Sequence, residues 1–384
     1  MNCPKCGTQN PDDAQVCTSC KSQLTQPPGP TETVQVKTSR IAIASFVLAI
    51  LSPFAFFLAA ILGIKTLAIT SIFTAMLALI LGIISLVQIG LSAGRVTGKA
   101  FVSIGIAILA VFFSLMFLQT VLPRTRSVAF RMVCGSNLSG IGRAMLIYAN
   151  DYDSALPRAG GRDTIWQPKI NNWKADNRID AFGLKRDGTG GSATISSSLY
   201  LLIKYAEIMP KSFICDKETR STEFKPAKYG VRDKEPEAFW DFGPEPSKHC
   251  SYSYHIPYCP YPLSTASSDP GMAVAADRNP WLDPSTDTTG FKWDDQTKTG
   301  GRENIKGYQK GNAGPHQREG QNVLFLDNHV SFEKQSFCGV NDDNIYTYWD
   351  GTDIRQGAPP VISSQPADKL DSLLVNDPPL NNSK

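Results

Sequence analysis

The sequence predicts a multidomain membrane protein: a small zinc-binding unit, an α-helical transmembrane bundle, and an α+β domain. Three observations lead to this fold class. Two CxxC pairs lie within the first twenty residues. Between Ile41 and Leu122 the only charged residues are Lys65, Arg95 and Lys99, whereas ordinary soluble domains carry charge throughout. Beyond this stretch the chain is polar, and its 384 residues suit two or three units.

The first unit, residues 1–24, has the cysteine pattern of a structural zinc site. Two CxxC pairs, with ten residues between them, can each form a tight knuckle, and two knuckles give four thiolates at a tetrahedral site (Cys3, Cys6, Cys17 and Cys20). Gly7 supplies the permissive backbone that such a turn needs. Four thiolates leave no position open for water, so we expect a structural zinc. A disulfide pair or a redox CxxC is the alternative, but no thioredoxin-like strand and helix surround it.

This unit resembles the short zinc ribbons that begin many bacterial membrane proteins. Its only basic residues near the knuckles are Lys5 and Lys21, and no aromatic residue precedes Phe46. Nucleic-acid binding depends on phosphate neutralisation and base stacking, so we expect no nucleic-acid partner. Residues 25–40 read as a flexible linker, because the Gln-Pro-Pro-Gly-Pro run at 26–30 cannot be helical.

The transmembrane domain, residues 41–122, contains three apolar runs, at about 41–63, 67–91 and 100–122. A helix needs roughly 20 apolar residues to cross a bilayer, and each run is long enough. The alternative is a buried soluble bundle, but uncharged runs of this length are rarely anything but membrane helices. The lipid bilayer is therefore a predicted partner.

Orientation follows from charge and from thiol chemistry. Basic residues flank the first span and separate the second from the third, which favours a cytoplasmic N-terminus (Lys37, Arg40, Arg95 and Lys99). Three arginines after the third span oppose this assignment (Arg124, Arg126 and Arg131). Reduced zinc-type thiols belong in the cytosol, which decides the question. We therefore expect a multi-pass protein of the bacterial inner (cytoplasmic) membrane whose C-terminal domain is extracytoplasmic.

The outer domain, residues 123–355, is predicted to be α+β. An apolar stripe indicates a helix over 127–152 (Cys134, Leu138, Ile141, Met145 and Tyr148), and a second helix fits 197–209. Short strands suit 213–215 and 272–276. The Asp327-Asn328 pair between two apolar runs, 322–326 and 329–332, predicts a β-hairpin. Residues 356–384 read as a disordered tail.

Two further resemblances support this division. The membrane block, through Ser39-Arg-Ile-Ala-Ile-Ala-Ser45, Leu81-Gly-Ile-Ile-Ser-Leu86 and the 94–100 loop leading into Ile104-Gly-Ile106, resembles a small multi-helix bacterial membrane domain of unknown function. The outer domain, through the 134–153 helix, Phe213-Ile-Cys-Asp216, Ser251-Tyr-Ser-Tyr254, Ala276-Asp-Arg-Asn-Pro280 and the 316–330 and 339–347 segments, is similar to type II secretion pseudopilin-like proteins of the planctomycete type. That resemblance implies a long helix packed on an antiparallel sheet.

Several outer residues are candidates for chemistry. A His/Asp/His set could bind a metal, although turn and surface roles also fit (His316, Asp327 and His329). An acidic run offers hard oxygen ligands, and pseudopilins can bind calcium in a C-terminal loop, although an Asp/Asn turn fits as well (Asn341, Asp342, Asp343 and Asn344). Cys250 and Cys259 are close enough in sequence to form a disulfide, but the pairing of the five outer cysteines stays open.

The sequence favours a non-enzymatic envelope protein, in which the ribbon folds around zinc, the bundle anchors the chain, and the outer domain contacts other envelope or secretion proteins. The alternative is a signal-transducing or sensor protein that couples the outer domain to the ribbon. The residues suggest no small-molecule substrate and no nucleophile motif. Zinc is the expected cofactor, with calcium as a second one.

Overall fold

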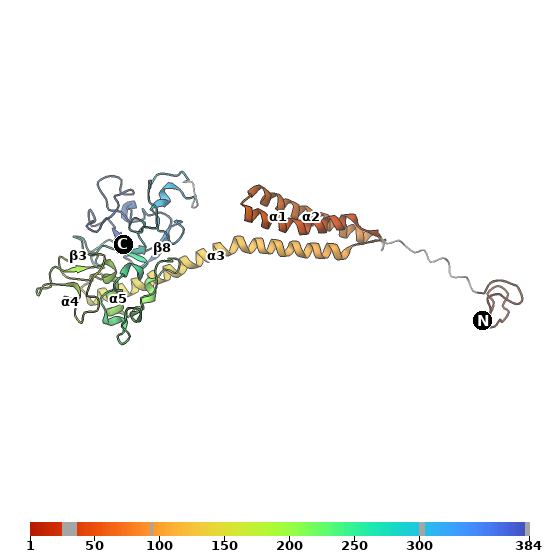
Figure 1. Cartoon of the computed structure of the whole chain (residues 1–384), viewed down its shortest axis with the longest axis horizontal. Coiled ribbons are helices and arrows are strands. Elements are labelled where there is room, and N and C mark those ends of the chain that lie inside the picture. The colour runs from red at the N-terminus through yellow and green to blue at the C-terminus, as the bar shows by residue number, and fades with distance from the viewer. Residues whose placement is uncertain (25–36, 93–94, 299–303, 381–384) are drawn as a thin grey trace. The chain divides into compact units, whose positions relative to one another are not determined.

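The computed structural model describes residues 1–24, 37–92, 95–298 and 304–380, so most of the predicted linker lies outside the described residues. The chain divides into two units, Met1–Leu122 and Pro123–Lys384, each with its own internal packing (Figure 1). This boundary follows the change from apolar to polar sequence.

The first unit contains three helices that are long and apolar enough to cross a membrane, as predicted. They are α1 (Arg40–Leu62), α2 (Lys65–Leu91) and the first part of α3 (Lys99–Asp151), whose spanning stretch is Lys99–Leu118. Ser39 caps α1 by accepting a hydrogen bond from the Ala42 amide, and Gly63 ends it in the left-handed conformation.

Small residues line the interior of this bundle, and large apolar residues cover its outside. Alanines fill its core together with a few larger side chains (Ala49, Ala75, Ala78, Leu109 and Phe112). Ile61 and Leu91 are 81% and 82% exposed. Water would disfavour such a surface, whereas lipid would not, and close approach of helices through small residues is the usual packing of membrane helices. The packing therefore agrees with membrane insertion.

A short parallel pairing joins the starts of α1 and α3. Strand β1 (Lys37–Thr38) pairs with β2 (Val96–Thr97). Gly98 follows β2 with φ 130°, and a Cβ there would lie 3.1 Å from that of Ala42. Glycine is thus required for the close approach of these two segments. The pairing gathers basic residues at one end of the bundle (Lys37, Arg40, Arg95 and Lys99).

The second unit is built on a five-stranded antiparallel sheet with the order β8-β7-β6-β5-β9. The strands are β5 (Tyr252–His255), β6 (Ala273–Asp277), β7 (Gln321–Phe325), β8 (Val330–Glu333) and β9 (Leu374–Val375). The predicted strand at 272–276 and the predicted hairpin are confirmed. Asn328 takes the left-handed conformation that its hairpin turn needs, with φ 71°.

The second part of α3 packs its predicted apolar stripe against this sheet. Leu138, Ile141 and Met145 share one buried core with Val274 and Leu324. A Cβ on Gly142 would lie 2.8 Å from the Leu324 side chain, so the missing side chain lets the helix approach the sheet. The region is therefore a helix on an antiparallel sheet, the general class predicted.

The remaining elements are short. A second helix, α5 (Ile195–Ala206), corresponds to the predicted one, and Thr194 caps it. Around it lie α4 (Arg178–Phe182) and the parallel pair β3 (Ile165–Trp166) and β4 (Ser192–Ala193). Seven 3-10 turns complete the described residues: Pro210–Phe213, Pro226–Tyr229, Pro236–Ala238, Pro246–Lys248, Pro280–Leu282, Gly307–Gly311 and Val340–Asp342.

Two predictions are wrong. No strand forms at 213–215: Phe213 is the last residue of a 3-10 turn that Pro210 begins, because proline favours the first position of a helical turn, and Ile214 and Cys215 follow it outside any strand. The tail expected to be disordered folds into the domain up to residue 380. Leu373, Leu374 and Val375 are fully buried, and β9 pairs with β5. The apolar run in this tail supplies an edge strand and part of the core.

Candidate metal centre

The four N-terminal cysteines lie on two knuckles with the same backbone pattern. In the first knuckle the Cys3 amide donates to the Thr8 carbonyl at 2.9 Å, and the Gly7 amide donates to the Cys3 carbonyl at 2.8 Å. The second knuckle repeats this with Cys17 donating to Ser22 and Lys21 donating to Cys17, at 2.8 and 3.0 Å. Gly7 and Lys21 occupy the same left-handed position, with φ 73° and 53°. Gly7 was expected there, whereas Lys21 was not.

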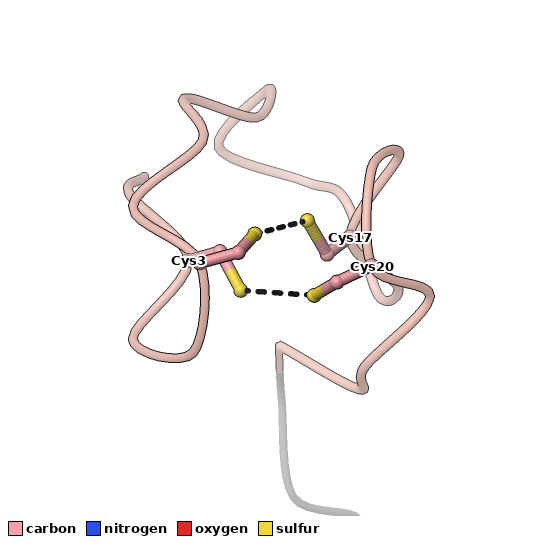
Figure 2. Close-up of side chains that lie close together, drawn as sticks. Cys3, Cys17 and Cys20 are labelled. Carbon is pink, nitrogen blue, oxygen red and sulfur yellow. Dashed lines mark hydrogen bonds between the residues drawn. The ribbon is translucent and has the colours of Figure 1, made fainter.

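The knuckles bring the four sulfurs together, as the sequence predicts. Cys3 Sγ lies 3.7 Å from Cys20 Sγ (Figure 2). Cys6 Sγ lies 3.5 Å from Cys17 Sγ. All four sulfurs lie within 4.8 Å of one another. In a tetrahedral zinc site with Zn–S bonds of roughly 2.3 Å, neighbouring sulfurs are about 3.8 Å apart. The set is therefore arranged to hold one metal ion such as zinc.

Hydrogen bonds around Cys3 and Cys17 favour the thiolate form that a metal requires. At Cys6 the hydrogen bonds from Thr8 are outweighed by the neighbouring Cys20 and Cys17 sulfurs, which raise the pKa of Cys6. The Ser22 hydroxyl, 3.3 Å from Cys3 Sγ, and the backbone amide of Lys5 lower the pKa of the Cys3 thiol to about 6. The backbone amide of Cys20 likewise lowers the pKa of Cys17. Because thiolates bind metal and thiols must first lose a proton, this environment suits metal binding near neutral pH.

Asn10 joins the two knuckles, a role that the sequence did not reveal. Its side chain is buried and donates from Nδ2 to the Thr8 carbonyl at 2.8 Å, while Cys17 Sγ lies 3.5 Å from the same nitrogen. Its Oδ1 accepts hydrogen bonds from the amide and the hydroxyl of Thr18, at 2.9 and 3.0 Å.

The structure does not bring the predicted His/Asp/His set together. His329 and Asp327 lie on the exposed turn between β7 and β8 and contact each other, with Nδ1 2.5 Å from Oδ1. His316 is buried, and its Nε2 lies 3.2 Å from Asp277 Oδ2 and 3.4 Å from Asn322 Nδ2, at the other end of β7. The triad as proposed is therefore wrong.

Two residues of the predicted calcium loop have a structural role. Asp343 is buried, and its Oδ2 accepts a hydrogen bond from the Ser372 amide at 2.7 Å. Asn344 is also buried and donates from Nδ2 to the Arg355 carbonyl at 3.1 Å. Through these hydrogen bonds, Asp343 and Asn344 hold the backbone at Ser372 and Arg355 against the second unit. Asn341 and Asp342 are less buried and lie at positive φ, and calcium binding here stays a prediction.

The structure does not pair Cys250 with Cys259, the disulfide considered from the sequence. Cys134 and Cys215 form a disulfide with Cα atoms 5.3 Å apart. Cys250 and Cys259 are free, and burial raises the pKa of these thiols to about 12 and about 11. Strand β5 lies between them and extends the chain, so closeness in sequence did not become closeness in space. The pairing of Cys250 with Cys259 is therefore wrong.

Comparison with known proteins adds no family. The chain matches no protein family, no curated protein and no solved structure among those with which it was compared. The metal-type cysteine cluster and the three apolar helices thus rest on the chain's own residues.

Proposed function

We propose that this chain is a non-enzymatic, membrane-anchored envelope protein of bacteria. In this proposal a structural zinc ribbon lies in the cytoplasm, three helices cross the inner membrane, and the second unit is exported and contacts other envelope proteins. One observation carries the proposal. The thiol chemistry changes across the apolar helices, from four clustered thiols before them to a buried disulfide after them. Disulfides persist in oxidising compartments and zinc-type thiols in reducing ones.

The donor set supports zinc as the metal of the ribbon. Soft thiolates favour zinc, copper(I) or iron–sulfur chemistry, and four of them at tetrahedral spacing are typical of structural zinc. A closed set of four sulfurs leaves no position for substrate, which is why the proposal gives the metal a folding role. In a unit this small, metal binding supplies most of the folding free energy.

The charges at the ends of the bundle support the proposed orientation. Lys37, Arg40 and Lys99 gather at the end where α1 and α3 begin, and Lys65 begins α2 at the opposite end. One of the three arginines after the third span weighs less than it does in the sequence alone. Arg131 pairs with Glu319, and its guanidinium carbon lies 4.3 Å from the Phe332 ring centre, so this charge serves the fold of the second unit.

The packing of α3 on an antiparallel sheet is what the resemblance to pseudopilin-like proteins implies, and the proposed protein contacts rest on that resemblance. We therefore propose that the second unit is a pseudopilin-like domain. Crosslinking in intact cells should then capture envelope or secretion proteins through this unit. Recovery of an uncrosslinked monomer alone would count against the proposed contacts.

Labelling of cysteine variants with a membrane-impermeant maleimide tests the orientation. Ala266→Cys is exposed in the second unit, and Asp13→Cys is exposed in the ribbon. In intact spheroplasts the Ala266→Cys variant should be labelled, whereas the Asp13→Cys variant should be labelled only after the membrane is permeabilised. Labelling of Ala266→Cys only after permeabilisation would overturn the export of the second unit.

A further inference from the structure

The buried disulfide lies beside a carboxylate and an imidazole that a disulfide does not need. Cys134 and Cys215 form, together with Asp277 and His316, a second cluster whose ligand atoms all lie within 4.8 Å of one another. The four residues come from α3, from the segment after the Pro210–Phe213 turn, from the end of β6, and from the loop before β7. All four are buried.

Two distances in this cluster are close to the edges of a tetrahedral metal site. His316 Nε2 lies 3.2 Å from Asp277 Oδ2 and 3.9 Å from Cys215 Sγ. Bond lengths of roughly 2.0–2.1 Å to nitrogen and oxygen and 2.3 Å to sulfur give N···O and N···S edges of about 3.4 and 3.5 Å. Two thiolates, one imidazole and one carboxylate are all zinc ligands.

One carboxylate oxygen of Asp277 is buried without a hydrogen-bond partner among the described residues. Asp277 is fully buried, and its Oδ2 accepts a hydrogen bond from the Asn322 amide at 2.7 Å. Its Oδ1 has no hydrogen-bond partner among the described residues. An unsatisfied buried carboxylate oxygen is costly, so such groups are usually paired or bind a metal.

We propose that Cys134, Cys215, Asp277 and His316 form a second zinc site that opens when the disulfide is reduced. A dithiol reductant transfers two electrons and two protons to the disulfide, becomes a disulfide itself, and leaves two thiols. These thiols release two protons as they bind Zn²⁺, and His316 Nε2 and Asp277 complete the tetrahedron. A disulfide oxidant reverses the change: it accepts two electrons from the two thiolates and two protons from water, becomes a dithiol, and the sulfur–sulfur bond of Cys134 and Cys215 forms again as Zn²⁺ leaves.

Zinc bound at the second site can be measured only when the ribbon no longer binds metal. The full chain carrying Cys3→Ser and Cys6→Ser, solubilised in detergent, provides this background. The protein is reduced with a phosphine, freed of reductant, exposed to Zn²⁺ and analysed for metal per chain. We expect about one zinc after reduction and none while the disulfide is intact. Co²⁺ in place of Zn²⁺ should show the absorption of a tetrahedral site with two thiolates.

Variants then assign the ligands. In this background His316→Gln should weaken zinc binding at least about tenfold, since even second-shell changes cost that much, whereas His329→Gln on the exposed turn should leave it unchanged. If His316→Gln fails to fold, the nearly isosteric Asp277→Asn serves the same purpose. Absence of zinc from a fully reduced, folded protein would overturn the proposal. Zinc bound equally well by the ligand variants would also overturn it.

Discussion

Asn10 contributes to the metal centre without binding metal. Its amide holds the two knuckles together and approaches Cys17 Sγ, which orients this ligand. We predict that Asn10→Ala retains one zinc per chain but weakens zinc affinity about 10–100-fold, the usual cost of losing an outer-shell partner. Competition with a chelating dye measures this change. Gln15→Ala, at an exposed ribbon position, is the control, and equal affinities for the two variants would contradict this role.

The ribbon cysteines give a second prediction at this scale. Replacing both Cys3 and Cys17 with serine removes one ligand from each knuckle and should cost one zinc per chain. Elemental analysis measures this in protein whose Cys134–Cys215 disulfide is intact. Cys338→Ser, which lies outside both clusters, should keep the zinc. An unchanged zinc content in the double variant would exclude the ribbon as the metal site.

Asp241 makes the stability of the second unit depend on pH. Burial, together with the nearby Asp377 carboxylate, raises the pKa of Asp241 to about 8. An unfolded aspartate titrates near pH 3.9, so the folded state holds the proton more tightly. The stabilisation is complete below about pH 4 and is lost as pH rises through about 8, by up to about 1.4 kcal/mol per pH unit.

We therefore predict that Asp241→Asn makes the free energy of unfolding of the second unit less dependent on pH between 5 and 7. All six tryptophans lie after residue 123, so tryptophan fluorescence of the full chain in detergent reports on this unit alone. Asp233→Asn, on the surface, is the control. An unchanged pH dependence in Asp241→Asn would show that protonation of Asp241 does not cause the pH dependence of the stability of the second unit.

The site residues that could be predicted from the sequence are those whose neighbours along the chain form a recognisable pattern. The zinc cysteines follow from spacing alone, because each CxxC pair forms its own turn. Asp277 and His316 carry no such signal, since their meeting depends on the sheet and on a loop 39 residues later in the sequence. For the same reason, the pairing of Cys134 with Cys215, separated by 81 residues, could not be derived.

Two glycines of α3 distinguish helix propensity from packing. A Cβ on Gly142 would meet the Leu324 and Asn328 side chains, whereas one on Gly140 meets nothing within 4 Å. We predict that Gly140→Ala raises the free energy of unfolding by up to about 1 kcal/mol through helix propensity. Gly142→Val should lower it by about 1–3 kcal/mol through overpacking. Urea unfolding followed by tryptophan fluorescence tests both, and a stabilising Gly142→Val would contradict the close helix–sheet contact.

The C-terminal segment is an integral element of the second unit. Leu374 is fully buried in β9, whereas Val361, in the same segment, is 61% exposed. We predict that Leu374→Ala lowers the free energy of unfolding by about 2–4 kcal/mol and that Val361→Ala changes it little. The same fluorescence measurement applies. Equal effects for the two variants would mean that the segment does not pack as described.

Elements with a clear period or turn residue were predictable, and those defined by tertiary contact were not. The α3 stripe and the hairpin at Asp327-Asn328 have such local signals. The tail is rich in residues that favour disorder, and its short apolar run becomes a strand only because β5 offers an open edge. The segment at 213–215 has strand-like composition, but Pro210 sets the preceding turn.

At the scale of the whole molecule, the three apolar helices separate two kinds of thiol chemistry. Composition alone predicts the spans, because some eighty residues with three charges are typical of membrane helices. Composition does not determine the side of the membrane on which each unit lies, so the sequence indicates it only through the positions of the basic residues and the cysteines.

Trapping the thiol state of each cysteine in living cells tests the central claim most directly. Cells are quenched with acid, free thiols are blocked with a light maleimide, and disulfides are then reduced and labelled with a heavy one before peptide mass spectrometry. We predict heavy label on Cys134 and Cys215 and light label on the four ribbon cysteines of the same protein. Light label on Cys134 and Cys215, or heavy label on the ribbon, would contradict the account.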